Sequence, residues 1–154
     1  MSPEQVVTPE ITWAALLPLI ILALGGVLLL TVTSLMKGSA PRALAPIWTA
    51  GTAVLTIAAV IPLWAKVQGW DAILWWDFAD LWWQEISTEP GAFSTIGGAF
   101  GVDGFSLFVT VLVAVAVLAT TAFVFGYLRR EGLEHPDVYA LMLLSATGGV
   151  GMAG

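Results

Sequence analysis

Four long apolar segments without an internal charge constrain this chain more than any other feature. They cover about residues 11–36, 44–66, 104–128 and 138–154, and Lys66 only closes the second. An α-helix rises about 1.5 Å per residue and a bilayer's hydrocarbon core is about 30 Å thick. The first three segments are therefore long enough to cross a membrane, and the fourth lies at the lower limit. We expect an all-α membrane protein, a polytopic bundle of four transmembrane helices.

The composition agrees with a membrane protein and excludes several other classes. Hydrophobic residues make up 58% of the 154 residues and charged residues 10%, against about 25% charged in soluble domains. Five basic residues without a basic stripe argue against a nucleic-acid partner. Because the chain has no Cys, it offers no disulfide, no thiolate zinc site and no ordinary iron–sulfur ligands. We expect residues 1–154 to form a single membrane domain in contact with the lipid bilayer.

The fourth segment is shorter than the others, and neither a basic residue nor an interfacial aromatic follows it. Transmembrane helices normally continue into such anchors. We therefore expect the last helix to be truncated and the chain to be the N-terminal part of a longer subunit. The alternative is a short but complete fourth helix.

The distribution of Lys and Arg predicts the orientation. Lys37 and Arg42 lie between the first two segments, and Arg129 and Arg130 lie between the last two, whereas Lys66 is alone on the opposite side. Cytoplasmic loops carry the excess of basic residues. These two loops are therefore expected in the cytoplasm, with the N-terminus outside.

Tryptophans mark the expected membrane interfaces, where an indole keeps its ring in apolar surroundings and its N–H wet. All eight fall near the ends of apolar segments or between them: Trp13, Trp48, Trp64, Trp70, Trp75, Trp76, Trp82 and Trp83. Five of them, with several acids, lie in residues 67–102, which we expect to be a Trp-rich acidic extracytoplasmic loop. Its stretch "WDAILWWDFADLWWQEI" is interpreted as lying on the outer membrane surface, as a helix or a hairpin. A sugar or quinone platform is the alternative.

The sequence Gly149-x-Gly151-x-x-Gly154 matches the G-x-G-x-x-G of dinucleotide-binding loops. That fingerprint requires a preceding buried strand and an acidic residue about 20 residues further on. Here it lies within an apolar segment of membrane-spanning length. We therefore interpret these glycines, with Gly148, as small residues that let helices approach closely.

Several ionisable residues near the segment ends are candidates for a functional role. Lys66 is either a proton-relay lysine or one that snorkels to the headgroups. Asp103 is either a proton port or a helix N-cap, and His135 is either a ligand or solvated. Glu134 and Asp137 are expected to stabilise the N-terminus of the last helix, because acidic side chains interact favourably with the positive end of the helix dipole. In each case the structural interpretation is preferred, so we predict no catalytic, cofactor-binding or metal-binding residue in this chain.

One stretch resembles a known family. "GVDGFSLFVTVLVAVAVLATTAFVFGYLRREGLEHPDVYALMLLSATGGVGMAG" is similar to the start of subunit N of bacterial proton-translocating NADH:quinone oxidoreductase, respiratory complex I. The similarity lies in the Asp-Gly-Phe-Ser opening at residues 103–106, a helix ending in Tyr-Leu before a charged loop, the aromatic Tyr139, and "ALMLLSATGG". "WAALLPLIILALGGVLLL" resembles the first helix of the family more loosely.

The resemblance implies a multi-pass subunit of about fourteen helices in the bacterial cell (inner) membrane, with its N-terminus outside. It implies a translocase that couples electron transfer from NADH to quinone with outward proton transport. FMN and iron–sulfur clusters are then expected in partner subunits, and quinone is the acceptor of the complex. The family's pumping residues belong to later helices, so none is carried over and this stretch alone is not catalytic.

Two alternatives to this function stay open. Family members often carry an acidic residue near the inner end of the first helix, where this chain has Thr31, Thr33 and Ser34. One alternative is the homologous subunit of a multi-subunit sodium/proton antiporter. The other is a small, non-catalytic membrane scaffold protein.

Overall fold

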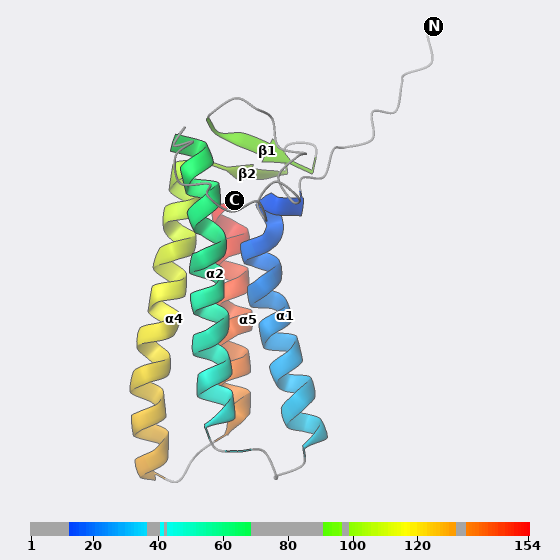
Figure 1. Ribbon diagram of the computed structural model, residues 1–154. Helices are drawn as coiled ribbons and strands as arrows, with labels where there is room; N and C mark the ends of the chain where they lie inside the picture. The colour runs from blue at the N-terminus through cyan, green and yellow to red at the C-terminus, as the bar shows by residue number, and fades with distance from the viewer. Residues whose placement is uncertain (1–12, 37–40, 42, 69–90, 97–98, 132–134) are drawn as a thin grey trace, which may run out of the picture.

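The computed structural model describes residues 13–36, 41, 43–68, 91–96, 99–131 and 135–154. Within these residues the chain forms four helices and one short hairpin (Figure 1). The elements are, in chain order, α1 (Trp13–Leu35), α2 (Leu44–Gln68), β1 (Phe93–Thr95), β2 (Phe100–Val102), α4 (Gly104–Glu131) and α5 (Pro136–Ala153).

The helices run alternately in opposite directions and pack side by side (Figure 1). Helix α1 contacts α2 and α5, α4 contacts the same two helices, and α2 also touches α5 across the bundle. The end of α1, the start of α2, the end of α4 and the start of α5 therefore lie at one end, which we call the basic end because Arg129 and Arg130 occupy the last turn of α4. The hairpin lies at the other end (Figure 1).

Three of the four expected spans are confirmed as helices that are long and apolar enough to cross a membrane: Trp13–Leu35, Leu44–Ala65 and Gly104–Glu131. The fourth segment is also helical, as α5, but that it crosses the membrane stays a prediction, and so does the outside position of the N-terminus. Several boundaries differ by a few residues from those expected: α1 ends at Leu35 and α2 continues to Gln68. Helix α4 continues to Glu131, because Arg129 and Arg130 suit the negative end of its dipole. Helix α5 begins earlier, with Pro136 in its first turn, where the missing N–H costs nothing.

The interior of the bundle is mostly aliphatic, with Tyr139 and several threonines among the buried residues. A central cluster includes Leu22, Leu29, Ala53 and Leu143, all fully buried, and a second cluster near the hairpin includes Val60. Large apolar side chains cover the outside as well, among them Leu24, Val54, Leu112 and Phe123. Helices that are hydrophobic all round are buried or span a membrane. Since these faces are exposed here, they are suited to contact lipid.

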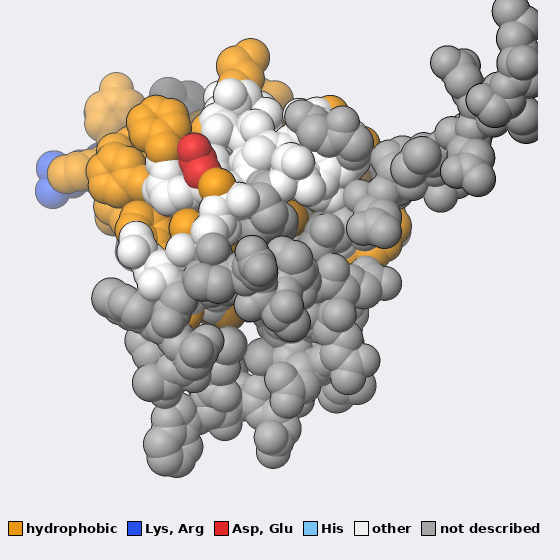
Figure 2. All heavy atoms as spheres, turned by 90° about the horizontal axis from the view of Figure 1, so that it is seen from above, with side chains coloured by type: hydrophobic (Ala, Val, Ile, Leu, Met, Phe, Trp, Pro, Cys, Tyr) orange, Lys and Arg blue, Asp and Glu red, His pale blue; other side chains and the backbone are white. Residues whose placement is uncertain are grey.

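The hairpin closes one end of the bundle. Its strands pair antiparallel, with Phe93 opposite Val102, and the Gly101 N–H donates to the Gly154 carbonyl at 2.7 Å. Ile96 in the turn has φ 57°, a left-handed conformation uncommon for a β-branched residue. Figure 2 looks onto this end and shows hydrophobic side chains around much of the described rim. The stretch "WDAILWWDFADLWWQEI" at residues 70–86 lies wholly outside the described residues, so its expected conformation stays a prediction.

Candidate functional site

The hydroxyls of the buried threonines in the helices bond within their own helix. The Thr49 hydroxyl donates to the Ala45 carbonyl at 2.9 Å. In the same way, the Thr110 hydroxyl donates to the Ser106 carbonyl at 2.8 Å and the Thr121 hydroxyl to the Val117 carbonyl at 2.7 Å. Among the described residues, no buried side-chain nitrogen or oxygen lacks a hydrogen-bond partner. A hydroxyl that satisfies its own helix has no donor left for a neighbour. These groups therefore stabilise the bundle interior and present no obvious ligand set.

The three apolar spans contain no Asp, Glu, Lys, Arg or His between Trp13 and Leu35, Leu44 and Ala65, or Gly104 and Leu128. Ion and proton pathways in membranes normally use ionisable residues. In the part of the chain that the structure describes, no three His, Cys, Asp or Glu residues gather as a metal site either. Within these residues the three spans supply apolar packing surface.

Asp103 begins α4, and its N-cap interpretation is confirmed. The Ser106 N–H donates to the Asp103 carboxylate at 2.6 Å, and the Asp103 N–H donates to the Ser106 hydroxyl at 3.0 Å. This reciprocal pair is a capping box that satisfies two backbone donors. The hydrogen bond from the Ser106 backbone is the main reason why the pKa of Asp103 lies below its ordinary value of 3.8. Asp103 thus stabilises the start of α4.

Because the pKa of Asp103 is lowered in the folded state, its carboxylate stabilises the fold above about pH 3.8. That contribution is lost as the pH falls through the lower pKa of the folded protein. We expect Asp103→Asn, which keeps a capping oxygen but does not titrate, to lose less thermal stability than the wild type between pH 5 and about pH 3. Thermal unfolding of the micellar protein by circular dichroism measures this. If the difference in thermal stability between the wild type and Asp103→Asn were the same at both pH values, the charge of Asp103 would have no role in stability.

The other ionisable candidates that the structure describes do not lie together at one place. His135 occupies the N-cap position of α5, is exposed and makes no side-chain capping bond, and Asp137 lies in the first turn, as expected. Lys66 belongs to α2, but its side chain lies outside the described residues, as does all of Glu134. Asp103 is at the opposite end of α4 from the loop before His135. The described positions therefore do not assemble a shared site.

The glycine motif lies in one continuous helix up to its last residue, Gly154, which is the C-cap, so the helical interpretation is confirmed. Gly148, Gly149 and Gly151 are all within α5. A Cβ on Gly151 would lie 3.4 Å from Leu19 of α1, and one on Gly149 would lie 3.9 Å from Val113 of α4. These two glycines therefore lie at helix contacts where a Cβ would make an ordinary van der Waals contact. The expectation of close helix approach is wrong for Gly148, which faces open space, and a Cβ on Gly154 would meet Phe100 of β2 and not a helix.

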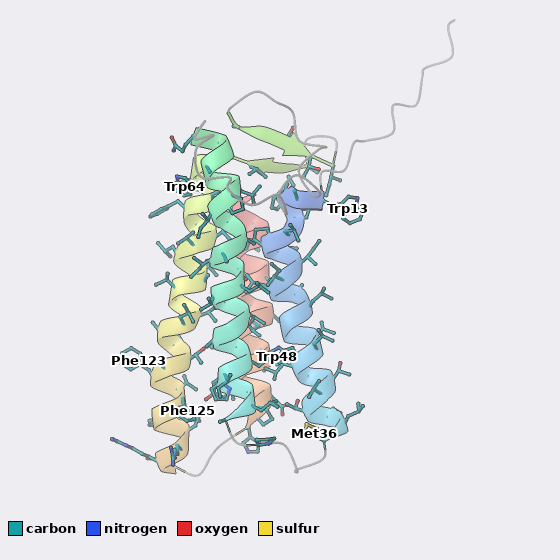
Figure 3. The ribbon with its side chains drawn as sticks, viewed as in Figure 1. Trp13, Met36, Trp48, Trp64, Phe123 and Phe125 are labelled. Carbon is teal, nitrogen blue, oxygen red and sulfur yellow. The ribbon has the colours of Figure 1, made fainter. Side chains whose placement is uncertain are left out.

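A close contact between α1 and α2 was missed by sequence reasoning. The Trp48 indole N–H donates to the Gly25 carbonyl of α1 at 3.0 Å, and a Cβ on Gly25 would lie 2.6 Å from the Thr52 methyl group. Trp48 was expected only as an interface anchor, whereas it also joins two helices (Figure 3). The Gly25-Gly26 pair inside an apolar helix was the available signal, because small residues mark close helix contacts. Trp13 and Trp64 do lie near the hairpin end, in keeping with the interfacial expectation (Figure 3).

The comparisons with known proteins give one partial similarity. The chain is 34% identical over 61 residues to NADH-quinone oxidoreductase subunit N of Parvibaculum lavamentivorans. This alignment covers 39% of the chain and 13% of that relative, so the chain spans a small part of its length. No family model matches the chain, and no solved structure matches it. The similarity agrees with the resemblance found from the sequence and supports a membrane subunit of that kind.

Proposed function

We propose that this chain is part of an antiporter-like membrane subunit of a proton-translocating NADH:quinone oxidoreductase. The observation that carries the proposal is the 34% identity to a subunit N, found in a chain with three helices fit to cross a membrane. The complete enzyme would transfer electrons from NADH to quinone and move protons outward. FMN and iron–sulfur clusters would be held by partner subunits, since this chain has no Cys.

Within such a subunit, the described helices would supply packing surface rather than the proton path. Their spans lack ionisable residues, and their buried hydroxyls bond to their own helices. Proton translocation needs groups that change protonation as neighbouring charges change. Those groups would come from further parts of the subunit, and the bundle would hold neighbouring helices in place. Its exposed apolar side chains support a position in the membrane, and the basic end is expected in the cytoplasm.

The proposal is tested by asking what the protein assembles with. We expect a chromosomally tagged protein, solubilised in a mild detergent, to migrate on a native gel with NADH-oxidising activity. We also expect its reading frame to continue beyond codon 154 into helices with membrane-embedded Glu and Lys. Co-migration with small membrane subunits but without NADH oxidation would favour the antiporter function. Migration as a small free species, with a stop after codon 154, would contradict the proposal and favour a scaffold.

A further inference from the structure

The hairpin is attached to the C-terminal end of α5 by two contacts. The Gly101 N–H of β2 donates to the carbonyl of Gly154, the C-cap of α5. A Cβ on Gly154 would overlap the Phe100 ring, so this ring lies directly against the helix end. The last carbonyls of a helix and the N–H groups at a strand edge lack partners within their own elements. The hydrogen bond therefore satisfies one group of each, where the end of α5 lies beneath the hairpin (Figure 1).

One face of the hairpin lies on the bundle and the other faces outward, as alternation along a strand requires. Thr95 and Val102 are buried, whereas Ser94 and Ile96 are exposed. Val102 packs in the cluster near the hairpin, together with Leu107 of α4. The hairpin residues that the structure describes contribute to this cluster and not to the central one. The bundle can therefore keep its central packing if the hairpin moves.

A small cavity of about 10 Å³ lies beneath the hairpin. Phe100 and Val102 of β2 line it, and so do Ser106 and Thr110 of α4, while α1 and α5 form its other walls. A cavity of this size has room for roughly one water molecule. Because Ser106 and Thr110 are both buried, the hairpin forms part of the barrier between their hydroxyls and the solvent at this end.

The hairpin is held less firmly than the helices. Its strands have three residues each, and an isolated two-stranded hairpin is at most marginally stable in water. Ile96 in the turn has φ 57°, a conformation that costs free energy for a β-branched residue. Elements with few buried contacts open locally before the whole fold does. The capping box of Asp103 and Ser106 fixes the start of α4, so a movement of β2 would end at Asp103.

We propose that the hairpin is a lid that releases from the end of α5 while the bundle stays folded, and that its release admits water to Ser106 and Thr110. In the closed state, a backbone hydrogen bond and the Phe100 ring hold the lid on α5. In the open state, β2 moves away from the helix end and the cavity joins the solvent. The inference depends on the packing at this end alone, and it stands whether or not the protein belongs to an NADH-oxidising complex.

The test places a single thiol beneath the lid, which is possible because the chain has no Cys. Thr110→Cys replaces a hydroxyl that lines the cavity, and Thr121→Cys replaces a buried hydroxyl of the same helix away from it. The full chain in micelles is treated with a small charged methanethiosulfonate, and the rate of modification is followed by mass spectrometry. We expect Thr110→Cys to react faster than Thr121→Cys, because the reagent reaches it whenever the lid opens.

Gly154→Leu should favour the open lid, because the added side chain displaces the Phe100 ring. We expect the rate at Thr110→Cys to rise about tenfold and the rate at Thr121→Cys to stay unchanged. Phe100→Ala, which removes the ring, should act in the same direction. Gly148→Leu is the matched control, because it adds the same side chain to the same helix in open space. It should leave both rates unchanged.

Three results would overturn the proposal. One is an unchanged rate at Thr110→Cys in both Gly154→Leu and Phe100→Ala. Another is an equal rise at Thr121→Cys, which would mean that the whole bundle loosens. The third is an equal rise with Gly148→Leu, which would remove the role of the Phe100 contact. Hydrogen exchange of the Gly101 amide needs no thiol and should accelerate in Gly154→Leu as well. Circular dichroism establishes that each variant is folded before it is labelled.

Discussion

Replacing Leu143 with alanine is expected to lower the free energy of unfolding by about 2–5 kcal/mol. Leu143 of α5 is fully buried in the central cluster, together with Leu22 and Leu29 of α1. Truncation leaves a cavity whose lining loses its van der Waals contacts, and such packing is a main source of helix association in a membrane. Unfolding by SDS in mixed micelles, followed by circular dichroism, measures the change.

Leu141→Ala is the matched control, because it removes the same atoms from the same helix. Leu141 is 63% exposed, so its side chain faces away from the bundle. We expect its effect to stay within about 0.5 kcal/mol, as for most substitutions outside the core. Equal destabilisation by the two substitutions would mean that α5 does not pack through Leu143 as described.

The second large effect is expected at Gly25, where α1 approaches α2. Gly25→Val should destabilise the bundle by about 1–3 kcal/mol, the usual cost of overpacking. A Cβ there would lie 2.6 Å from the Thr52 Cγ2 and 3.1 Å from its Cβ, so the Thr52 side chain or the helices themselves must shift. Separation of the helices also strains the bond from the Trp48 indole to the Gly25 carbonyl. The same SDS titration detects the loss.

The steric cause can be isolated with a smaller change. Gly25→Ala should destabilise the protein, and adding Thr52→Ser should restore part of the loss, because serine lacks the methyl group but keeps a hydroxyl for the Thr49 carbonyl. Gly51→Ala on α2 adds the same methyl group in open space and should be neutral or slightly stabilising. Strictly additive effects of Gly25→Ala and Thr52→Ser would exclude a direct clash.

The helices were predictable because membrane length and apolar composition are local properties of the sequence. The three spans and the helical state of Gly149 and Gly151 followed from this. The capping role of Asp103 was predictable for the same reason, since the Asp103 and Ser106 pair depends on residues three positions apart.

The contacts between helices were not predictable from the sequence. In a helix that is apolar all round, hydrophobic periodicity does not show which face is buried. Leu141 and Leu143 look alike in the sequence, yet one is exposed and the other buried. The bond from Trp48 to Gly25 joins residues 23 positions apart, and no local pattern encodes such a pairing. The hydrogen bond from the Gly101 N–H to the Gly154 carbonyl joins residues that lie still further apart in the sequence.

The hydrogen bonds that the buried threonines make within their own helices affect how easily an ion could pass through the bundle. The hydroxyls of Thr49 and Thr121 donate to carbonyls of their own helices, and the three spans contain no ionisable side chain. An ion that entered the described bundle would therefore lose its hydration and gain few hydrogen bonds or opposite charges in return. The bundle is therefore suited to act as a dielectric barrier. Beside any conducting element it would insulate, so that ions would cross the membrane along that element and not through these helices.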